Sequence, residues 1–80
     1  MAKELVIEEV MKEVFQATPH LLKLPEGKMW IDYDEEADVL YISFKRPQKA
    51  TDSEMLNNGA LLRYRDHELV GITVLDASKR

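Results

Sequence analysis

The chain has 80 residues, with 15 acidic and 11 basic side chains, a formal net charge of −4 and no cysteine. This length allows one domain with a small core, and the lack of cysteine excludes disulfides, thiol nucleophiles and thiolate metal sites. The basic residues are scattered along an acidic chain, so we expect no binding to nucleic acid. No stretch approaches the roughly 20 apolar residues that span a bilayer, and no signal-peptide pattern begins the chain. We therefore expect a soluble cytoplasmic protein.

The first predicted element is an amphipathic helix over residues 3–17. Its apolar residues fall on one side of a helical wheel: Val6, Ile7, Val10, Met11, Val14 and Phe15. Thr18-Pro19 is expected to end the helix, because proline lacks a backbone donor and moves the preceding residue away from helical angles. The apolar stripe has two interpretations. It covers one face of a sheet, or it docks into a partner's groove or against the helix of a second copy.

After a connector over residues 19–27, the stretch from Trp30 to Phe44 has the pattern of a β-hairpin. Ile31 and Tyr33 alternate with polar or outward positions in its first half, and three apolar residues alternate in the second: Leu40, Ile42 and Phe44. Residues 34–38 are too acidic to bury and suit the turn between the two strands.

The remaining strands are separated by clear turn signals. Residues 45–50 contain Pro47 and are expected to form a loop, while residues 51–56 are either loop or a short edge strand. Asn57-Asn58-Gly59 predicts a hairpin turn, which is followed by a strand over residues 60–65 and a turn at Asp66-His67. Residues 69–75 are apolar on both faces and predict a central strand. Asp76 is expected to cap a helical turn that the short tail does not complete.

These elements predict an α+β fold, in which an N-terminal amphipathic helix packs on a four- or five-stranded antiparallel β-meander. We expect a single domain over residues 1–80, with the helix at 1–18, the connector at 19–27, the sheet at 28–76 and a tail at 77–80. A small core and the unpaired edges of an open sheet favour a homodimer.

Two stretches of the chain resemble a known family. They are residues 33–42 (YDEEADVLYI) and residues 69–78 (LVGITVLDAS), with Ser53 and Gly59 between them. In this order they are similar to the small prokaryotic domain-of-unknown-function family 2283. The resemblance implies a compact β-rich fold and supplies no catalytic residue, because the family has none assigned. Some of its members occur in small gene pairs of toxin–antitoxin type, which implies a binding role by analogy. The turn at Asp66-His67 lacks the glycine often found there in the family.

Four carboxylates at alternate positions are the candidates for weak cation binding: Asp32, Asp34, Glu36 and Asp38. Their spacing matches the opening of an EF-hand calcium loop. However, Ala37 stands where that loop needs glycine, and Ser43 stands where it needs a bidentate acid. We therefore expect a solvated hairpin loop and no dedicated metal site.

No pattern of catalytic residues is present. Three serines and two histidines could form a triad on paper, namely Ser43, Ser53, Ser78, His20 and His67, but no nucleophile elbow accompanies them. The chain also lacks a Gly-rich phosphate loop and a His-Glu-x-x-His motif. We expect no enzyme activity, no catalytic residue and no cofactor.

Trp30 is the strongest candidate for contact with a partner, because it alternates with the predicted core positions of its strand. Either the helix or a second subunit covers it, or it is a hot spot for a partner. Tyr41, Arg63 and Arg65 are further candidates, although a solvated sheet face also explains the two arginines, as it does the neighbouring Lys45, Arg46 and Lys49.

The function predicted from the sequence is a non-enzymatic protein–protein interaction or regulatory module, as one half of a toxin–antitoxin-like gene pair with a small protein partner. The alternative is a domain that binds a small ligand or, weakly, a cation. An enzyme of unknown type ranks third.

Overall fold

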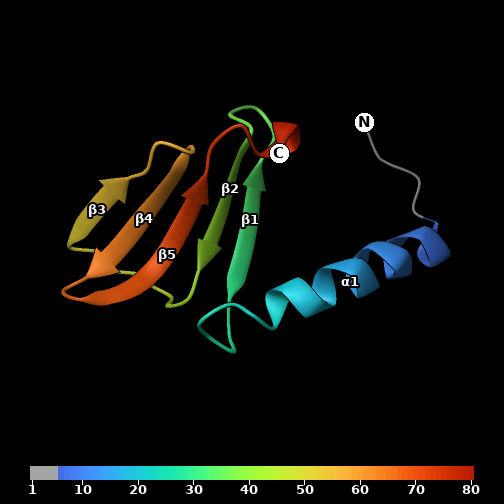
Figure 1. Cartoon of the computed structure of the whole chain (residues 1–80), viewed down its shortest axis with the longest axis horizontal. Coiled ribbons are helices and arrows are strands. Elements are labelled where there is room, and N and C mark those ends of the chain that lie inside the picture. Colours follow the sequence, from blue (N-terminus) through green and yellow to red (C-terminus); the bar gives the residue numbers. More distant parts are fainter. Residues whose placement is uncertain (1–5) are drawn as a thin grey trace.

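The structure is a computed structural model that describes residues 6–80. One helix precedes five antiparallel strands of a single sheet (Figure 1). The elements are α1 (Ile7–Leu21), β1 (Trp30–Asp34), β2 (Val39–Ser43), β3 (Asp52–Met55), β4 (Ala60–Arg65), β5 (Glu68–Val74) and the 3-10 helix η1 (Ala77–Lys79). The predicted α+β class with an N-terminal helix is confirmed. The part of the predicted helix before residue 6 lies outside the described residues.

The strands are arranged in the order β1-β2-β5-β4-β3. β1 and β2 form a hairpin, and β3, β4 and β5 form an antiparallel meander whose last strand pairs with β2. The connection over residues 44–51 therefore carries the chain from β2 to the far edge of the sheet. β5 is the central strand, between β2 and β4, as its two apolar faces predict. A strand that is apolar on both faces is typical of the inner part of a sheet, where less of it is exposed to water.

The ambiguous stretch over residues 51–56 contains the edge strand β3. Its hairpin with β4 has the predicted turn, in which Gly59 adopts a positive φ of 89°. The amide of Leu56 donates to the carbonyl of Ala60 at 2.8 Å, and the amide of Ala60 donates to Asn58 Oδ1 at 3.1 Å. Asn58 and Gly59 thus stabilise the turn through a side-chain acceptor and a left-handed backbone angle.

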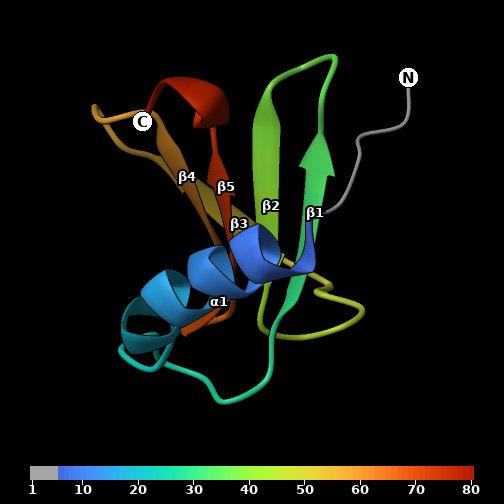
Figure 2. The ribbon, with the colours of Figure 1, turned by 90° about the vertical axis from the view of Figure 1, so that its right-hand side faces the viewer.

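The helix does not pack on the sheet, so this part of the predicted fold is wrong. α1 extends away from the lower end of β1 and stands apart from the strands (Figures 1 and 2). None of its residues is buried, and Ile7 and Phe15 of its apolar stripe are 68% and 66% exposed. Helical periodicity shows that one side of the helix needs an apolar cover, but it does not specify which surface supplies it.

The helix also continues beyond Pro19 and ends at Leu21, so the predicted end at Thr18-Pro19 is wrong. Pro19 stands in the last turn, where its missing amide removes only the bond to the Phe15 carbonyl. The helix is maintained around it, because Thr18 Oγ1 donates to the carbonyl of Val14 at 2.7 Å and the amide of Leu22 donates to that of Thr18 at 3.1 Å. Within the range that the structure describes, no helix is long and apolar enough to cross a membrane.

The strand register divides the sheet into two faces. We call one the apolar face, and it carries Ile31, Tyr33, Leu40, Ile42, Leu62, Ile72 and Val74. The other is the Trp30 face, with Trp30, Tyr41, Ser43, Leu61, Arg63, Gly71 and Thr73. The predicted alternation is confirmed, but burial does not follow it. Ile31 and Tyr33 are 50% and 48% exposed, while the buried hydrophobic side chains are Val39, Phe44 and Val70.

The connection over residues 44–51 folds back onto the Trp30 face. Gln48 Nε2 donates to Ser43 Oγ at 2.7 Å, and the amide end of Gln48 lies directly against the Cα of the buried Gly71. A Cβ at position 71 would overlap that amide group. Gly71 therefore leaves the space that the Gln48 amide occupies, and a larger residue would displace this flexible side chain.

We expect Gly71→Ala to lower the free energy of unfolding by about 1 kcal/mol, because the added Cβ displaces Gln48 from its bond to Ser43. In a Gln48→Ala background the same substitution should be neutral or stabilising, since alanine restricts the unfolded chain more than glycine does. Urea unfolding of the four proteins of this cycle measures the coupling. Equal effects of Gly71→Ala in both backgrounds would show that Gln48 is not the constraint.

Candidate functional site

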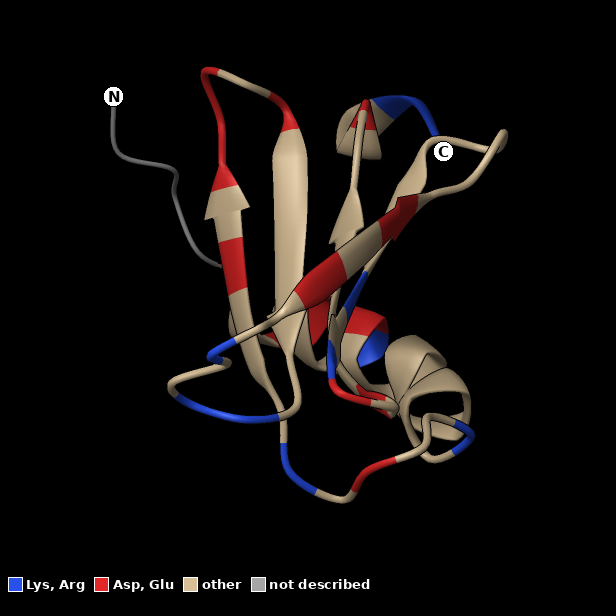
Figure 3. Ribbon diagram, turned by 90° about the vertical axis from the view of Figure 1, so that its left-hand side faces the viewer, with Lys and Arg blue, Asp and Glu red and all other residues tan. Residues whose placement is uncertain are grey.

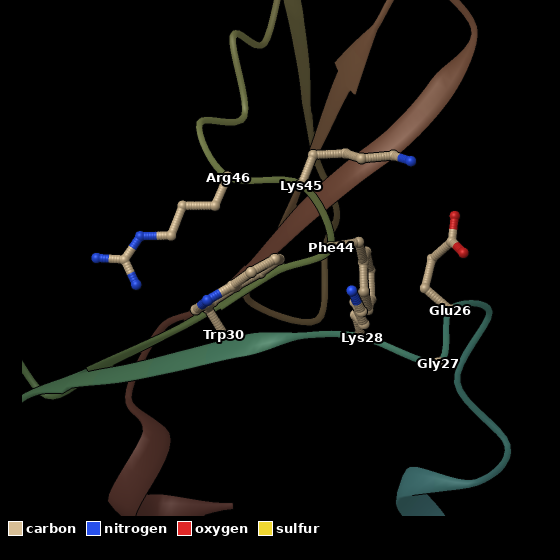
Figure 4. A pocket seen from close by; sticks show the side chains of 7 residues that line it. All are labelled: Glu26, Gly27, Lys28, Trp30, Phe44, Lys45 and Arg46. Carbon is tan, nitrogen blue, oxygen red and sulfur yellow. The ribbon is translucent and has the colours of Figure 1, made fainter.

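A groove of about 420 Å³ lies where β1 begins and β2 ends (Figure 4). It is lined by Glu26, Gly27, Lys28, Trp30, Phe44, Lys45 and Arg46. The connector before β1 and the connection after β2 supply most of these residues, and β1 supplies Trp30. In Figure 4 the Trp30 indole lies between Arg46 on one side and Phe44 with Lys28 on the other. Trp30 is half-buried by these neighbours and by the sheet, so of its predicted alternatives the cover by the helix is wrong, while a second subunit or a partner stays a prediction.

The groove is locally basic on an acidic protein. Lys28, Lys45 and Arg46 are exposed side chains that face a single carboxylate, that of Glu26. Figure 3 shows that acidic residues colour the β1–β2 loop and β3, whereas the connection over residues 44–51 carries Lys and Arg. Lys45 Nζ lies 3.9 Å from a carboxylate oxygen of Glu68, an exposed contact that leaves the lysine available to other anions.

The structure brings three of the four predicted partner residues to one face. Trp30, Tyr41 and Arg63 share the Trp30 face by register, and the phenol-bearing side chain of Tyr41 is 42% exposed. Arg63 is half-buried, and its Nε has no hydrogen-bond acceptor among the described residues. Arg65 lies at the exposed end of β4, beyond the register shift between Arg63 and Tyr64.

Sequence reasoning did not select Lys28 or Glu26, and it interpreted Lys45 and Arg46 as solvated. The signal was weak because the basic residues of the groove come from two segments about 17 residues apart. Only the β1–β2 pairing, which places Trp30 opposite Ser43, brings those segments together. Of the residues that line the groove, Trp30 is the one that the sequence pattern indicated as a contact residue.

The carboxylates of the β1–β2 loop act mainly as turn acceptors. Asp34 Oδ1 accepts the amides of Glu36 and Ala37 at 3.1 and 3.2 Å, which is an Asx-type turn. Asp32 is exposed on β1 and Glu36 is exposed in the loop. Over residues 6–80 no three His, Cys, Asp or Glu side chains gather as a metal site. Weak cation binding by Asp32, Asp34, Glu36 and Asp38 stays a prediction.

Asp38 joins the first hairpin to the end of the chain. Its Oδ1 accepts the Tyr33 hydroxyl at 2.6 Å and the Ser78 amide at 2.9 Å, and its Oδ2 accepts the Ser78 hydroxyl at 2.8 Å. The backbone carbonyl of Asp38 also accepts the Ala77 amide at 2.9 Å. Asp76 makes no side-chain cap bond and adopts a left-handed φ of 51°, so the predicted cap at Asp76 is wrong. The side chain that accepts the Ser78 amide at the start of η1 is instead Asp38, 40 residues earlier in the chain.

These bonds also shift proton affinities. The hydrogen bond from Tyr33, followed by those from Ser78, lowers the pKa of the Asp38 carboxyl below its ordinary value of 3.8. The same Asp38 bond raises the pKa of the Tyr33 phenol above its ordinary value of 10.0. Both shifts follow from donors that stabilise the charged carboxylate and an acceptor that stabilises the neutral phenol.

The tail over residues 77–80 is held by a second set of bonds. Arg80 donates from Nε and Nη2 to the Leu75 carbonyl at 3.1 and 2.8 Å, and from Nη1 to the Asn58 carbonyl at 2.7 Å. Its guanidinium lies against Gly59, so the β3–β4 turn and the chain end contact each other.

The serines and histidines considered for a triad lie at separate places. Ser43 is bonded to Gln48 and Ser78 to Asp38, while Ser53 is exposed on the edge strand. His20 lies near the end of α1 and His67 in the β4–β5 turn. The structure brings neither histidine into hydrogen-bond contact with these serines in the range it describes.

The single antiparallel sheet, the shallow basic groove and the helix that stands apart define a small α+β protein with exposed apolar and basic surfaces. The family described as a protein of unknown function (DUF2283) matches residues 30–78, and the chain belongs to it. The matched segment runs from the start of β1 into η1 and leaves out α1. No curated protein and no solved structure shows significant similarity to the chain.

Asp38→Asn should reduce thermal stability at neutral pH, and the gap to the wild type should close as the pH falls below about 4. The reason is that a lowered carboxyl pKa stabilises the fold fully above 3.8, and this contribution is lost as the pH falls through the folded-state pKa. Melting temperatures of both proteins between pH 2.5 and about 7 measure the gap. Asp32→Asn is the matched control on the same hairpin. A gap that stays constant or widens in acid would contradict the role of Asp38.

Proposed function

We propose that the chain is a non-enzymatic interaction module with a regulatory role, as one half of a small two-protein system of toxin–antitoxin type. Its partner is a small protein that binds the Trp30 face. The observation that carries this proposal is the position of Trp30 in a basic groove, on the same sheet face as Tyr41 and Arg63. The two-protein setting rests on the resemblance to the family alone.

The residue types on this face support contact with a protein. Tryptophan, tyrosine and arginine supply most of the residues whose truncation strongly weakens protein complexes. The half-buried indole of Trp30 and the exposed ring of Tyr41 offer rigid apolar area next to long cationic side chains. A site of this kind holds an anchor side chain in its centre and charged contacts at its rim.

The charge of the groove indicates the chemistry of the partner segment. Lys28, Lys45 and Arg46 outnumber the single acid, Glu26, in the lining. An acidic segment that inserts one apolar or aromatic side chain beside Trp30 would be complementary to it. Because these cations are exposed, they would mainly speed association, and binding should weaken with rising salt concentration.

Trp30→Ala should weaken partner binding by at least about 30-fold, the loss typical of an interface hot spot. The test captures the tagged full chain from its native cell lysate and measures the mass of the complex and the ratio of its components. Leu22→Ala is the matched control, because Leu22 is an 80% exposed apolar residue that lies outside the sheet and outside the groove lining. Capture of copies of this chain alone, or of the same partner by Trp30→Ala at full strength, would contradict the proposal.

The same groove favours a small anionic ligand as the second candidate function, because three cations and two aromatic residues, Trp30 and Phe44, line about 420 Å³. In that case inorganic phosphate or a nucleoside monophosphate should raise the melting temperature of the purified protein, and Arg46→Gln should abolish the rise. Lys49→Gln is the control, since Lys49 is a cation of the same connection outside the groove lining. No shift with any of these anions would remove this candidate.

A further inference from the structure

The apolar stripe of α1 is exposed and packs against no strand of the sheet within residues 6–80. Its members keep between 39% and 68% of their surface exposed: Val6, Ile7, Val10, Met11, Val14 and Phe15. The opposite side of the helix is polar, with Glu8, Glu9 and Glu13 among its residues. An isolated helix of 15 residues is marginal in water, so an amphipathic helix of this length is normally stabilised by contact along its apolar side.

The apolar face of the sheet is only partly covered. Val70 and Phe44, at the lower end of this face, are buried, but Leu40, Ile42, Leu62, Ile72 and Val74 on the inner strands are only partly buried, and Ile31 and Tyr33 on β1 are half exposed. The connection over residues 44–51 does not cover the exposed part, because Gln48 contacts Ser43 and Gly71 on the Trp30 face. The protein thus has two incompletely covered apolar surfaces, one on a helix and one on a sheet.

The solvent-accessible surface area of the chain is larger than that of a compact monomer. The chain exposes 6726 Å², whereas a compact monomer of 9.3 kDa exposes about 5,000 Å². The five residues outside the described range could expose at most about 850 Å² even when fully extended. An excess of at least about 900 Å² remains, and a standard stable interface buries about 800 Å² on each partner.

We propose that two copies of the chain form a symmetric dimer in which each α1 lies across the apolar face of the other copy's sheet. The dimensions agree, because a helix of 15 residues is about 22 Å long and five strands are about 19 Å wide. One two-fold operation covers both apolar surfaces of both copies, which makes the interface self-complementary. The interface leaves the Trp30 face free, so the dimer is independent of the function proposed for that face.

The test begins with sedimentation equilibrium of the purified full chain, which should give twice the 9.3 kDa chain mass. Val14→Glu on the helix and Ile31→Glu on the sheet should each weaken dimerisation by at least about 100-fold, because each puts a carboxylate into an apolar contact. Gln16→Glu and Met55→Glu are the matched controls on the polar side of α1 and on β3, and they should leave the dimer intact, as should Trp30→Ala. Val14 and Ile31 are about half exposed in one copy, so each variant keeps a folded chain, which circular dichroism verifies.

Mixing the two variants distinguishes this arrangement from the others. In a mixed dimer, the intact helix of the Ile31→Glu chain lies on the intact sheet of the Val14→Glu chain, so the mixture should dimerise at least about 10-fold more tightly than either variant alone. A wild-type monomer would overturn the proposal. Full dimerisation of Ile31→Glu would also overturn it, because it indicates contact between two helices. Full dimerisation of Val14→Glu would do the same, because it indicates contact between two sheets. If either glutamate variant fails to fold, Val14→Cys and Ile31→Cys chains replace them, since the protein has no other cysteine. A bismaleimide should then link one chain of each kind, and the lack of that heterologous link would overturn the proposal.

Discussion

A sheet of one layer has two faces, and an 80-residue chain with one helix held apart does not cover both of them. This constraint shapes the whole molecule. The chain uses its own loop on the Trp30 face, where Gln48 lies on Gly71, and leaves much of the apolar face exposed. The buried hydrophobic side chains are few, namely Val39, Phe44 and Val70, so hydrophobic stabilisation within one copy is small.

Long-range polar contacts join segments of the chain that the small core does not connect. Asp38 joins the first hairpin to η1 through Ser78, and Arg80 joins the chain end to the β3–β4 turn through Asn58. Each such bond contributes modestly because water competes for exposed groups. Their effect is mainly geometric, since they join the β1–β2 loop, the β3–β4 turn and the chain end at one end of the sheet. The geometry of the sheet, in turn, places Trp30 beside the cations of the neighbouring connection.

The two faces suit different roles. The Trp30 face combines an aromatic side chain with exposed cations, a composition that fits the charged partner proposed for it. The apolar face and the α1 stripe offer area without charge, which suits a permanent contact between identical chains. Under the two proposals, self-association through the apolar surfaces would leave the Trp30 face accessible to a partner.

The sequence by itself determined the local elements. Alternation predicted the strands, Asn58-Gly59 predicted a turn, and the double apolar character of residues 69–75 predicted the central position of β5. The motifs at residues 33–42 and 69–78 indicated the family that matches residues 30–78. Only the tertiary structure decided the strand order, the position of α1, the Asp38–Ser78 contact and the basic lining of the groove at Trp30. Periodicity and turn chemistry act over a few residues, whereas these features join segments about 17 to 40 residues apart and depend on register and packing that no local pattern records.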